Sequence, residues 1–576
     1  MKTPPFTRRK LIKGLTMGSM LPLLGANLIG CSDGSDTLAQ DLVDALFGTF
    51  EHGVASGDPL TDRVILWTRL TPLQAGPVSV AWEMSTDAAF ADVVASGSGT
   101  TDEAVDFTVK VDAQGLRPGT RYYYRFHSGD NTSVTGRTRT LPAGAVAAAS
   151  FAVVSCSNYP AGLFNVYKEV AAQDLDAVLH LGDYLYEYSS TGYASERAEE
   201  FGRVVQPANE ILSLQDYRTR YAQYRTDADL QAAHAAHPFI NVWDDHEVAN
   251  DAWREGAENH DPATEGSFSE RKAVAIQAWY EWQPVRPPAD ELDIIYRRFQ
   301  YGELLDLFML DTRIIGRDQQ LSYSDFLNGE FIDVEGVRAA FGDPMRSLLG
   351  DAQRTWLRDE LGQSTARWQV IGQQVLSGRY QLPAPIMEAL DPSIAGDDAI
   401  SQGTTAVLAA IDAKSKPEAE RTPEEQALLD SAIPYNLDAW DGYEYERDTL
   451  MTYAADMDLK LVMLAGDTHN AWAAQLTTPD ARIAGVEFGC ASVSSPGLEG
   501  VLGADAAALF SPLVVQLVDD LRYANLSDRG YLHLRFNADS VDASHRFIST
   551  IDSPDYAVLT DKTIEVAVAR NDMLLL

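Results

Sequence analysis

The spacing of hydrophobic and polar residues changes near residue 143 and divides the chain into two regions. Between residues 50 and 142, short runs of alternating hydrophobic and polar residues are separated by turn residues, a pattern typical of antiparallel strands. From residue 150 onward, apolar runs that predict buried strands alternate with longer amphipathic stretches that predict helices. We therefore predict a small β-sandwich over 50–142, a linker of small residues, and a layered α/β domain over 150–576.

The first region contains four predicted strands, over residues 64–69, 78–82, 107–111 and 122–126. The last of them begins at Tyr122 and follows the turn sequence Leu116-Arg117-Pro118-Gly119-Thr120-Arg121. This arrangement is similar to the fibronectin-type corner, in which a tyrosine ties the start of a strand to the preceding turn. Since no cluster of titratable residues lies in this region, we expect a structural role, and calcium-dependent adhesion through the sandwich would rest on fold analogy alone.

Polar residues follow the ends of five predicted strands in the second region. They are Ser155-Cys156-Ser157-Asn158 after strand 151–154, Gly182-Asp183-Tyr184-Leu185-Tyr186 after 177–181, Asp244-Asp245-His246-Glu247 after 239–243, Asp311-Thr312-Arg313 after 305–310, and Gly466-Asp467-Thr468-His469 after 459–464. Ligands of layered α/β folds gather at the carboxyl ends of the strands. We therefore expect these five segments to form one site.

The residues at these strand ends are typical of a metal site rather than of a nucleophilic triad. They offer carboxylates (Asp183, Asp245, Asp467), a thiolate (Cys156), a phenolate (Tyr186) and imidazoles (His246, His469). Asp183 and Tyr186 are three residues apart beyond a strand end, so both can reach one cation, and Gly182 allows the tight turn. Thiolate and phenolate favour a highly charged ion such as Fe³⁺, whereas carboxylates alone suit Ca²⁺, Mg²⁺ or Mn²⁺. Two unlike metals that share Asp183 would use this set most economically.

Residues 384 to about 434 interrupt the strand rhythm with Pro, Ala, Asp and Glu. Within them, Thr422-Pro423-Glu424-Glu425 forms a capping box with proline at the first helical position. We predict a helical insertion, which either covers the site or decorates the surface.

The N-terminus has the composition of a targeting segment. Arg8 and Arg9 precede a weakly apolar stretch over 14–30 that Pro22 interrupts, which is unlike a membrane span. The twin arginines resemble a Tat export signal, and Leu28-Ile29-Gly30-Cys31 resembles a lipobox whose Cys31 is acylated; the alternative is a chance match beside an ordinary cleavage site. We expect residues 1–31 to be the signal and 32–49 a spacer, with the protein exported by the Tat machinery to the periplasm or outer surface and either membrane-associated through lipidated Cys31 or released.

Charge and cysteine content argue against a nucleic-acid-binding protein and against a disulfide-stabilised one. Forty-five basic and 84 acidic residues give a net charge of −39, which disfavours nucleic-acid binding. Three cysteines are too few for a disulfide framework.

Taken in order, these motifs resemble the PhoD-type alkaline phosphatases, a branch of the metallophosphoesterases related in site design to purple acid phosphatases. The resemblance begins with Gly53-Val54-Ala55-Ser56-Gly57-Asp58-Pro59 and Leu66-Trp67-Thr68-Arg69-Leu70, continues through the five strand-end segments, and includes Asp438-Ala439-Trp440-Asp441-Gly442-Tyr443. It implies a metallophosphoesterase-type catalytic domain behind a fibronectin-like sandwich. The insertion before residue 433 departs from shorter family members and puts the substrate range in doubt.

Carried over residue by residue, the resemblance implies that Cys156, Asp183, Tyr186 and His469 hold Fe³⁺. Asp183 would bridge to Ca²⁺, held also by Asp245 and Asp467, while His246 donates a hydrogen bond or proton toward the leaving oxygen. Asp244 would orient a ligand, and Arg313 either clamps a substrate phosphate or forms a structural ion pair. Ser155 and Ser157 are weaker candidates for a covalent nucleophile because no base is assigned to them.

The implied activity is release of phosphate from organic phosphate esters. Two alternatives stay open. One is a phosphodiesterase or phospholipase-D-like hydrolase. The other is a non-catalytic, lipid-anchored protein that binds metal or phosphate.

Overall fold

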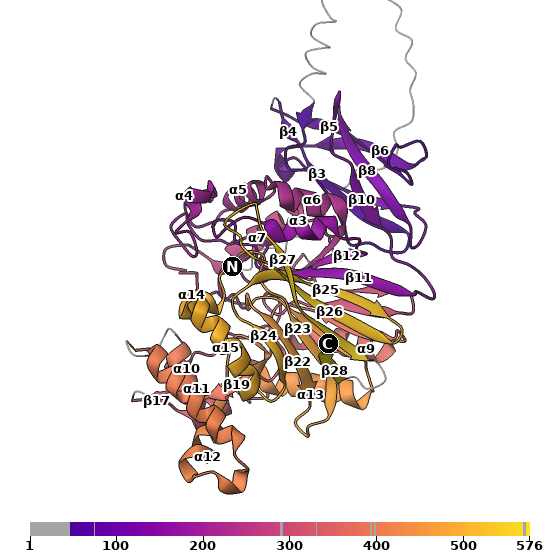
Figure 1. Cartoon of the computed structure of the whole chain (residues 1–576). Helices are drawn as coiled ribbons and strands as arrows, with labels where there is room; N and C mark the ends of the chain where they lie inside the picture. Colours follow the sequence, from indigo (N-terminus) through magenta and orange to yellow (C-terminus); the bar gives the residue numbers. More distant parts are fainter. Residues whose placement is uncertain are drawn as a thin grey trace, which may run out of the picture.

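The computed structural model describes residues 47–73, 75–288, 292–329, 331–391, 394–396, 399–567 and 572–575 (Figure 1). The predicted signal, Cys31 and most of the spacer lie outside the described residues.

A ten-stranded mixed sheet extends through the molecule, with strand order β28-β27-β26-β25-β11-β12-β13-β2-β3-β7. The neighbours β11, β12, β13 and β2 run parallel, and the remaining pairs are antiparallel. The strands are β2 (Val54–Gly57), β3 (Arg63–Arg69), β7 (Thr108–Gln114), β11 (Ala148–Val154), β12 (Ala177–His180), β13 (Pro238–Asn241), β25 (Arg529–Asn537), β26 (Ser540–Ile548), β27 (Val558–Ala567) and β28 (Asp572–Leu575).

A seven-stranded sheet packs against the first one, with order β14-β15-β18-β21-β23-β22-β24. The rings of Phe151 and Tyr301 (5.0 Å between centroids) and of Trp368 and Phe536 (5.9 Å) meet across the interface. The strands are β14 (Arg297–Tyr301), β15 (Leu305–Met309), β18 (Trp368–Gly372), β21 (Leu461–Ala465), β22 (Ala471–Thr477), β23 (Ile483–Gly489) and β24 (Leu521–Asn525). Because side chains alternate along a strand, Leu307 joins the core between the sheets and Phe308 joins the core under the outer helices.

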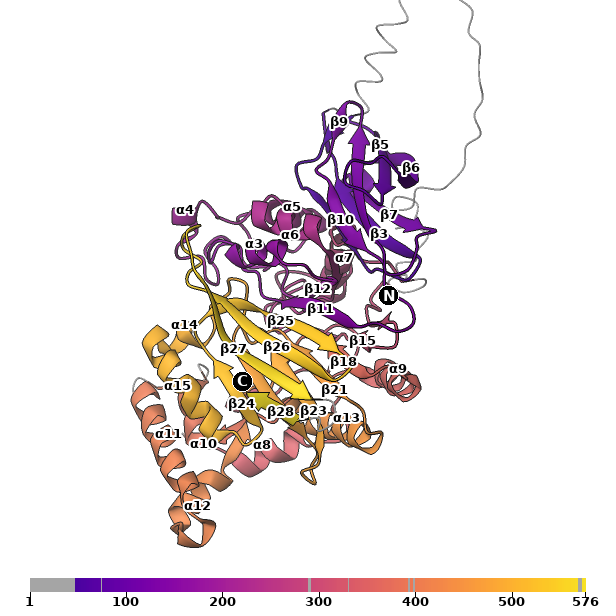
Figure 2. The same cartoon turned by 45° about the vertical axis from the view of Figure 1, so that its right-hand side comes forward.

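Helices cover the second sheet and part of the large sheet, whose strands β26 and β27 carry no helix on the face turned to the viewer in Figure 2. The group between the large sheet and the sandwich comprises α3 (Asn165–Ala172), α5 (Leu214–Tyr224), α6 (Ala228–Ala236) and α7 (Phe268–Trp282), with the short α4 (Ala198–Phe201) beside it. The group on the second sheet comprises α8 (Val334–Phe341), α9 (Gly350–Gln363), α13 (Glu444–Asp456), α14 (Leu498–Leu502) and α15 (Ala504–Leu517). These layers agree with the predicted α/β arrangement. Among the described residues, no helix combines the length and the apolar character needed to cross a bilayer.

The N-terminal region forms two layers. One is a sheet of order β10-β8-β5-β6, with β9 paired to β8, and the other is the β2, β3 and β7 end of the large sheet. The backbone N–H of Arg117 donates to the Tyr122 hydroxyl at 2.8 Å, so the predicted tyrosine corner is present. The strands are β5 (Val78–Ser85), β6 (Val93–Thr101), β8 (Arg121–Ser128), β9 (Asn131–Thr132) and β10 (Gly136–Arg139).

The sandwich is continuous with the second region of the chain, which the hydrophobic pattern did not predict. Strand β2 pairs in parallel with β13, with Ser56 opposite Pro238 and Gly57 opposite Phe239. One layer of the sandwich is therefore the end of the same sheet that carries the strand ends of the second region.

The insertion contains α10 (Ala384–Leu390), α11 (Ala399–Ser415) and α12 (Pro423–Asp430). The predicted capping box is present at α12, where Thr422 and Glu425 each accept a hydrogen bond from the other's backbone N–H. A two-stranded hairpin of β19 (Gln381–Pro383) and β20 (Ala432–Pro434) closes its base, and the helices lie at the opposite end of the molecule from the sandwich.

Candidate metal centre

Polar strand ends from both sheets meet at one edge of the two-sheet body. Donor atoms within 4.8 Å of one another form three groups: Cys156, Asp183 and His469; Asp183, Asp245 and His246; and Asp244, Asp245 and Asp467. Asp183 belongs to the first two groups and Asp245 to the last two. Five of the six predicted ligands belong to these groups, together with His246, predicted as a proton donor, and Asp244, predicted to orient a ligand. Asp183 and Asp467, predicted to share the second ion, fall in different groups.

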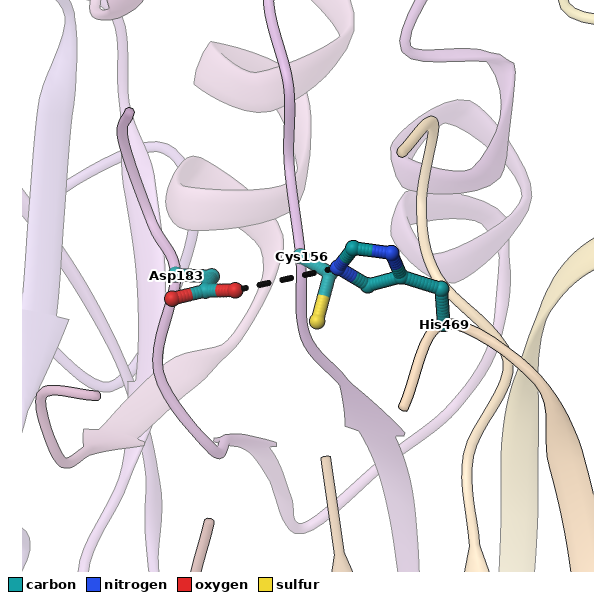
Figure 3. A group of neighbouring side chains, drawn as sticks. All are labelled: Cys156, Asp183 and His469. Atoms are coloured by element: carbon teal, nitrogen blue, oxygen red, sulfur yellow. Dashed lines mark ion pairs between the residues drawn. The ribbon is translucent and has the colours of Figure 1, made fainter. Parts of the chain in front are cut away.

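The first group, with Tyr186, will be called the thiolate half. Cys156 and Asp183 are buried, and His469 Nε2 lies 3.9 Å from Asp183 Oδ2 (Figure 3). The Tyr186 hydroxyl donates to Asp183 Oδ2 at 3.0 Å and lies 3.1 Å from His469 Nε2. His469 Nδ1 donates to the Pro496 carbonyl at 2.7 Å, which fixes the tautomer and leaves Nε2 as a donor atom for a cation.

Four predicted ligands have left-handed backbone conformations. The φ angles of Cys156, Asp183, Asp467 and His469 are 61°, 54°, 60° and 61°. This region is sparsely populated by residues other than glycine, and such conformations persist at functional sites when the surrounding structure enforces them. Gly182, with φ 106°, has the same sign, and a Cβ there would lie 2.6 Å from the backbone nitrogen of Asp244. The predicted tight turn at Gly182 is therefore confirmed, and a second reason for glycine is the close approach of the next ligand turn.

Four aspartates surround Arg313 and with it form the carboxylate half. Arg313 donates from Nε to Asp244 (2.5 Å), and from its two terminal nitrogens to Asp438 (2.6 Å) and Asp467 (2.7 Å). Asp245 lies 4.0 Å away, and the Arg313 side chain is completely buried. All three guanidinium nitrogens are engaged by carboxylates, so Arg313 forms the ion pairs of the structural alternative.

Burial and mutual repulsion raise the pKa of two of these carboxylates, whereas neighbouring cationic groups lower the pKa of a third. Burial raises the pKa of Asp467 to about 7, and the charges of Asp438 and Asp245 act in the same sense against Arg313. Burial likewise raises the pKa of Asp244 well above its usual range. For Asp245, burial is outweighed by Arg313 and His246, which hold its pKa below the usual range. The four aspartates of the carboxylate half can therefore carry more negative charge than the single guanidinium of Arg313 balances.

The donor set fits a bound cation. The Asp183 Oδ1 and Asp244 Oδ2 atoms are buried and have no hydrogen-bond partner. A buried carboxylate oxygen without a partner is costly, and a metal ion is one of the few groups that satisfies it. Thiolate, phenolate, imidazole and carboxylate within one small volume match a highly charged ion, and the aspartate groups match a harder divalent ion.

A buried carboxylate orients His246. Its Nδ1 lies 2.7 Å from Glu187 Oε2, and Glu187 also accepts from the Asn250 backbone (2.8 Å) and the Asn259 side chain (2.8 Å). Burial lowers the pKa of His246, but Asp245, Glu187 and Asp183 outweigh it and raise the pKa well above the ordinary value. Within the described residues, Nε2 has no hydrogen-bond partner and is left to meet a ligand.

Glu247 ties two ligand turns together. Its carboxylate accepts from the backbone nitrogens of Asp183 (3.1 Å), Tyr184 (2.6 Å) and Asp244 (2.7 Å). The turns after β12 and β13 are therefore held in one arrangement.

Sequence reasoning did not assign roles to Glu187, Glu247 or Asp438. Glu187 directly follows the segment 182–186, Glu247 is the last residue of the segment 244–247, and Asp438 is the first residue of the segment 438–443. The signal that the sequence offered was an acidic residue beside or near a predicted ligand. Their partners are distant in sequence, so the motif alone did not reveal them.

Comparison with known proteins finds similar chains over nearly the whole length. The family model described as PhoD-like phosphatase matches residues 151–545, and the model for the N-terminal domain of PhoD-like phosphatases matches residues 43–142. Alkaline phosphatase D of Bacillus subtilis (strain 168) is 34% identical over 577 aligned positions, which cover 96% of this chain and 86% of that protein. A solved structure described as the structure of PhoD superposes with a TM-score of 0.74 and 32% identity, covering 92% of each chain.

Proposed function

Because the chain belongs to the PhoD-like phosphatase family, and is accordingly a phosphoric ester hydrolase, we propose that it is an exported, metal-dependent phosphoesterase that releases phosphate from organic phosphate esters. The observation that carries the proposal is the convergence of Cys156, Asp183, Tyr186 and His469 at one edge, beside the aspartates around Arg313. We further propose that the two-sheet body is of the metallophosphoesterase type and the sandwich fibronectin-like.

The thiolate half would hold Fe³⁺, and Asp183, Asp245 and Asp467 would hold Ca²⁺. When bound, these ions would neutralise the phosphoryl oxygens and lower the pKa of an attacking water. Asp183 belongs to two donor groups, which is the arrangement that a bridging ligand requires.

The chain's own residues supply positioning and a proton. Glu187 fixes the His246 ring by accepting from Nδ1, so Nε2 is the atom that donates toward the leaving oxygen. Glu247 holds the Asp183 turn against the Asp244 turn, which fixes the separation of the donor groups. Ser155 is not needed as a nucleophile, since its hydroxyl lies between the thiols of Cys156 (3.1 Å) and Cys490 (3.3 Å).

The test is hydrolysis of matched aryl phosphate monoester and diester substrates by the purified protein, with bound iron and calcium measured in the same samples. Cys156→Ala should abolish turnover and lose iron while retaining its circular dichroism spectrum. Cys490→Ala is the matched control, because Cys490 is equally buried and bonds to the same serine but belongs to none of the donor groups. A Cys156→Ala variant that keeps both iron and turnover would refute the proposed centre. The monoester-to-diester ratio decides between phosphatase and phosphodiesterase activity.

We also propose export through the Tat route and anchoring at Cys31, supported by the twin arginines and the lipobox-like sequence. Replacing both Arg8 and Arg9 by lysine should leave the protein in the cytoplasm, and Cys31→Ser should release it from membranes, as followed by cell fractionation. An unchanged distribution in either case would contradict that part of the proposal.

A further inference from the structure

A pocket of about 530 Å³ lies at the joint between the sandwich and the catalytic region. Its walls include Leu60, Ile65 and Lys110 from the sandwich side and Tyr280, Arg286 and Phe299 from the catalytic side. Small-molecule sites have volumes of about 300–1,000 Å³, are mostly apolar with a few convergent polar groups, and favour domain interfaces. None of its lining residues belongs to the donor groups of the metal centre.

The lining is basic although the protein is acidic. Five cationic side chains, Arg63, Lys110, Arg286, Arg297 and Arg298, face two carboxylates, Asp58 and Asp112, in a chain of net charge −39. All four arginines already have carboxylate partners. Arg297 pairs with Asp58, Arg63 with Asp62, Arg286 with Asp112, and Arg298 with carboxylates outside the pocket. The decisive cation is therefore one that has no such partner.

Lys110 is that cation. It is 5% exposed, and its ammonium donates to the backbone carbonyls of Tyr280 and of Val285, the latter at 3.0 Å. In the described part of the chain no carboxylate oxygen lies within 4.0 Å of its Nζ. Burial lowers the pKa of Lys110 to about 7, which Asp58 and Glu281 oppose and Arg286 reinforces. In its protonated form the group has three protons, of which the two carbonyls take two and one remains for a ligand, and a bound anion would favour that protonated form.

A second buried polar group lines the same space without a partner. Tyr280 is completely buried, and its hydroxyl makes no hydrogen bond. Ile294 and Leu60 complete the apolar wall, and both are partly exposed toward the mouth. The pocket thus combines the amine of Lys110, which has no paired carboxylate, with an apolar wall, and Tyr280 adds a buried hydroxyl without a partner.

We propose that this pocket binds a small organic anion, whose anionic group lies beside Lys110 and whose apolar part contacts Leu60, Ile294 and Phe299. The anion supplies the counter-charge that Lys110 lacks, and burial of its apolar part displaces water from the wall.

The probe is 1-naphthalenesulfonate, which carries an aromatic ring system and one anionic group that is not an ester. Titration calorimetry of the metal-loaded protein should show one site per chain. Arg63→Glu reverses a partly exposed rim charge and should weaken binding about tenfold without changing turnover. Lys110→Met should weaken it at least as much. Arg482→Glu is the matched control, since it makes the same charge change at an exposed ion pair with Asp456 and should leave the affinity unchanged.

The outcomes are decisive even if Lys110→Met fails to fold, because Arg63→Glu reports on the same pocket. Absence of binding to the folded parent would overturn the proposal. Equal affinity of parent and Arg63→Glu, or equal weakening by Arg63→Glu and Arg482→Glu, would also overturn it, since binding would then lie elsewhere or reflect net charge alone.

Discussion

The two halves of the metal centre balance buried anionic groups by different means. In the thiolate half, protons do so: the Tyr186 hydroxyl donates to Asp183, and the Cys156 thiol donates to Ser155. In the carboxylate half, a fixed cation does so, because Arg313 bonds to three aspartates and lies near a fourth. A metal can displace protons from its ligands but cannot displace a side chain held in the fold. The first half is therefore built to be completed by an ion, and the second is already partly complete.

Asp183→Asn should have the largest effect on turnover, since Asp183 is the residue common to the thiolate group and the His246 group. Turnover should fall about a thousandfold because the electrostatic stabilisation of the phosphoryl group is lost. Bound metal, measured by mass spectrometry, should fall in parallel. Asp480→Asn changes an exposed aspartate and should leave both quantities unchanged. Near-normal turnover with full metal in Asp183→Asn would show that Asp183 is not a metal ligand common to these two groups.

The next largest effects on turnover are expected for His246→Asn and Glu187→Gln. Loss of a proton donor should lower kcat by about 10²- to 10⁴-fold, and loss of its orienting carboxylate by about 10- to 100-fold. Because Glu187 acts through His246, Glu187→Gln should cost little in the His246→Asn background. Additive losses in the double variant would assign Glu187 a separate structural role.

Arg313→Met tests the fixed cation directly. In the metal-free protein it leaves buried aspartates without a counter-charge and should lower the free energy of unfolding by about 3–5 kcal/mol. Added Ca²⁺ should recover more stability in this variant than in the parent, as measured by denaturant unfolding. Arg317→Met is a useful control, because Arg317 is equally buried but contacts only Asp438 among these aspartates. Equal responses to Ca²⁺ in parent and Arg313→Met would contradict the assigned role.

The smallest effect concerns Lys110, a buried cation that bonds only to carbonyls. Its pKa of about 7 in the folded protein lies below the unfolded value of 10.5, so the unfolded chain binds the extra proton between these pH values. Stability should therefore rise with pH from about 7 to 10, by up to a few kcal/mol. Lys110→Met should remove this rise, seen by comparing unfolding of the two proteins across that range. Parallel pH profiles would show that Lys110 keeps its charge throughout.

Local signals in the sequence predicted the elements well. Alternating residues marked β3, β5, β7 and β8, apolar runs marked β11, β12, β13, β15 and β21, and the tyrosine corner and the α12 capping box were correctly located. The ligand candidates at the strand ends also lie together, although their assignment to particular ions stays a prediction. Each of these features depends on residues close in sequence, or on the rule that parallel strands end at one edge.

Contacts between residues far apart in the chain could not be predicted from the sequence in the same way. The β2–β13 pairing joins residues about 180 positions apart, and nothing in Val54–Gly57 specifies that neighbour. Arg313 likewise gave no sign of its position among Asp244, Asp438 and Asp467, because ion pairs carry no sequence period. The left-handed conformations at Cys156 and His469 were also missed, since such conformations are unusual for these residues and are imposed by the surrounding structure.

The continuous ten-stranded sheet sets the order in which the protein can be completed during synthesis. Strand β11 pairs with β25, so Phe151 cannot pair with Leu534 until Leu534 has left the ribosome. Likewise, β2 cannot complete its pairing until β13 has been synthesised. Contacts so distant in sequence slow folding and leave strand edges open to other chains in the meantime. A nascent or truncated chain that stops before residue 529 would expose the edge of β11 next to Cys156. Such chains are the ones in which aggregation and protection by chaperones should concentrate.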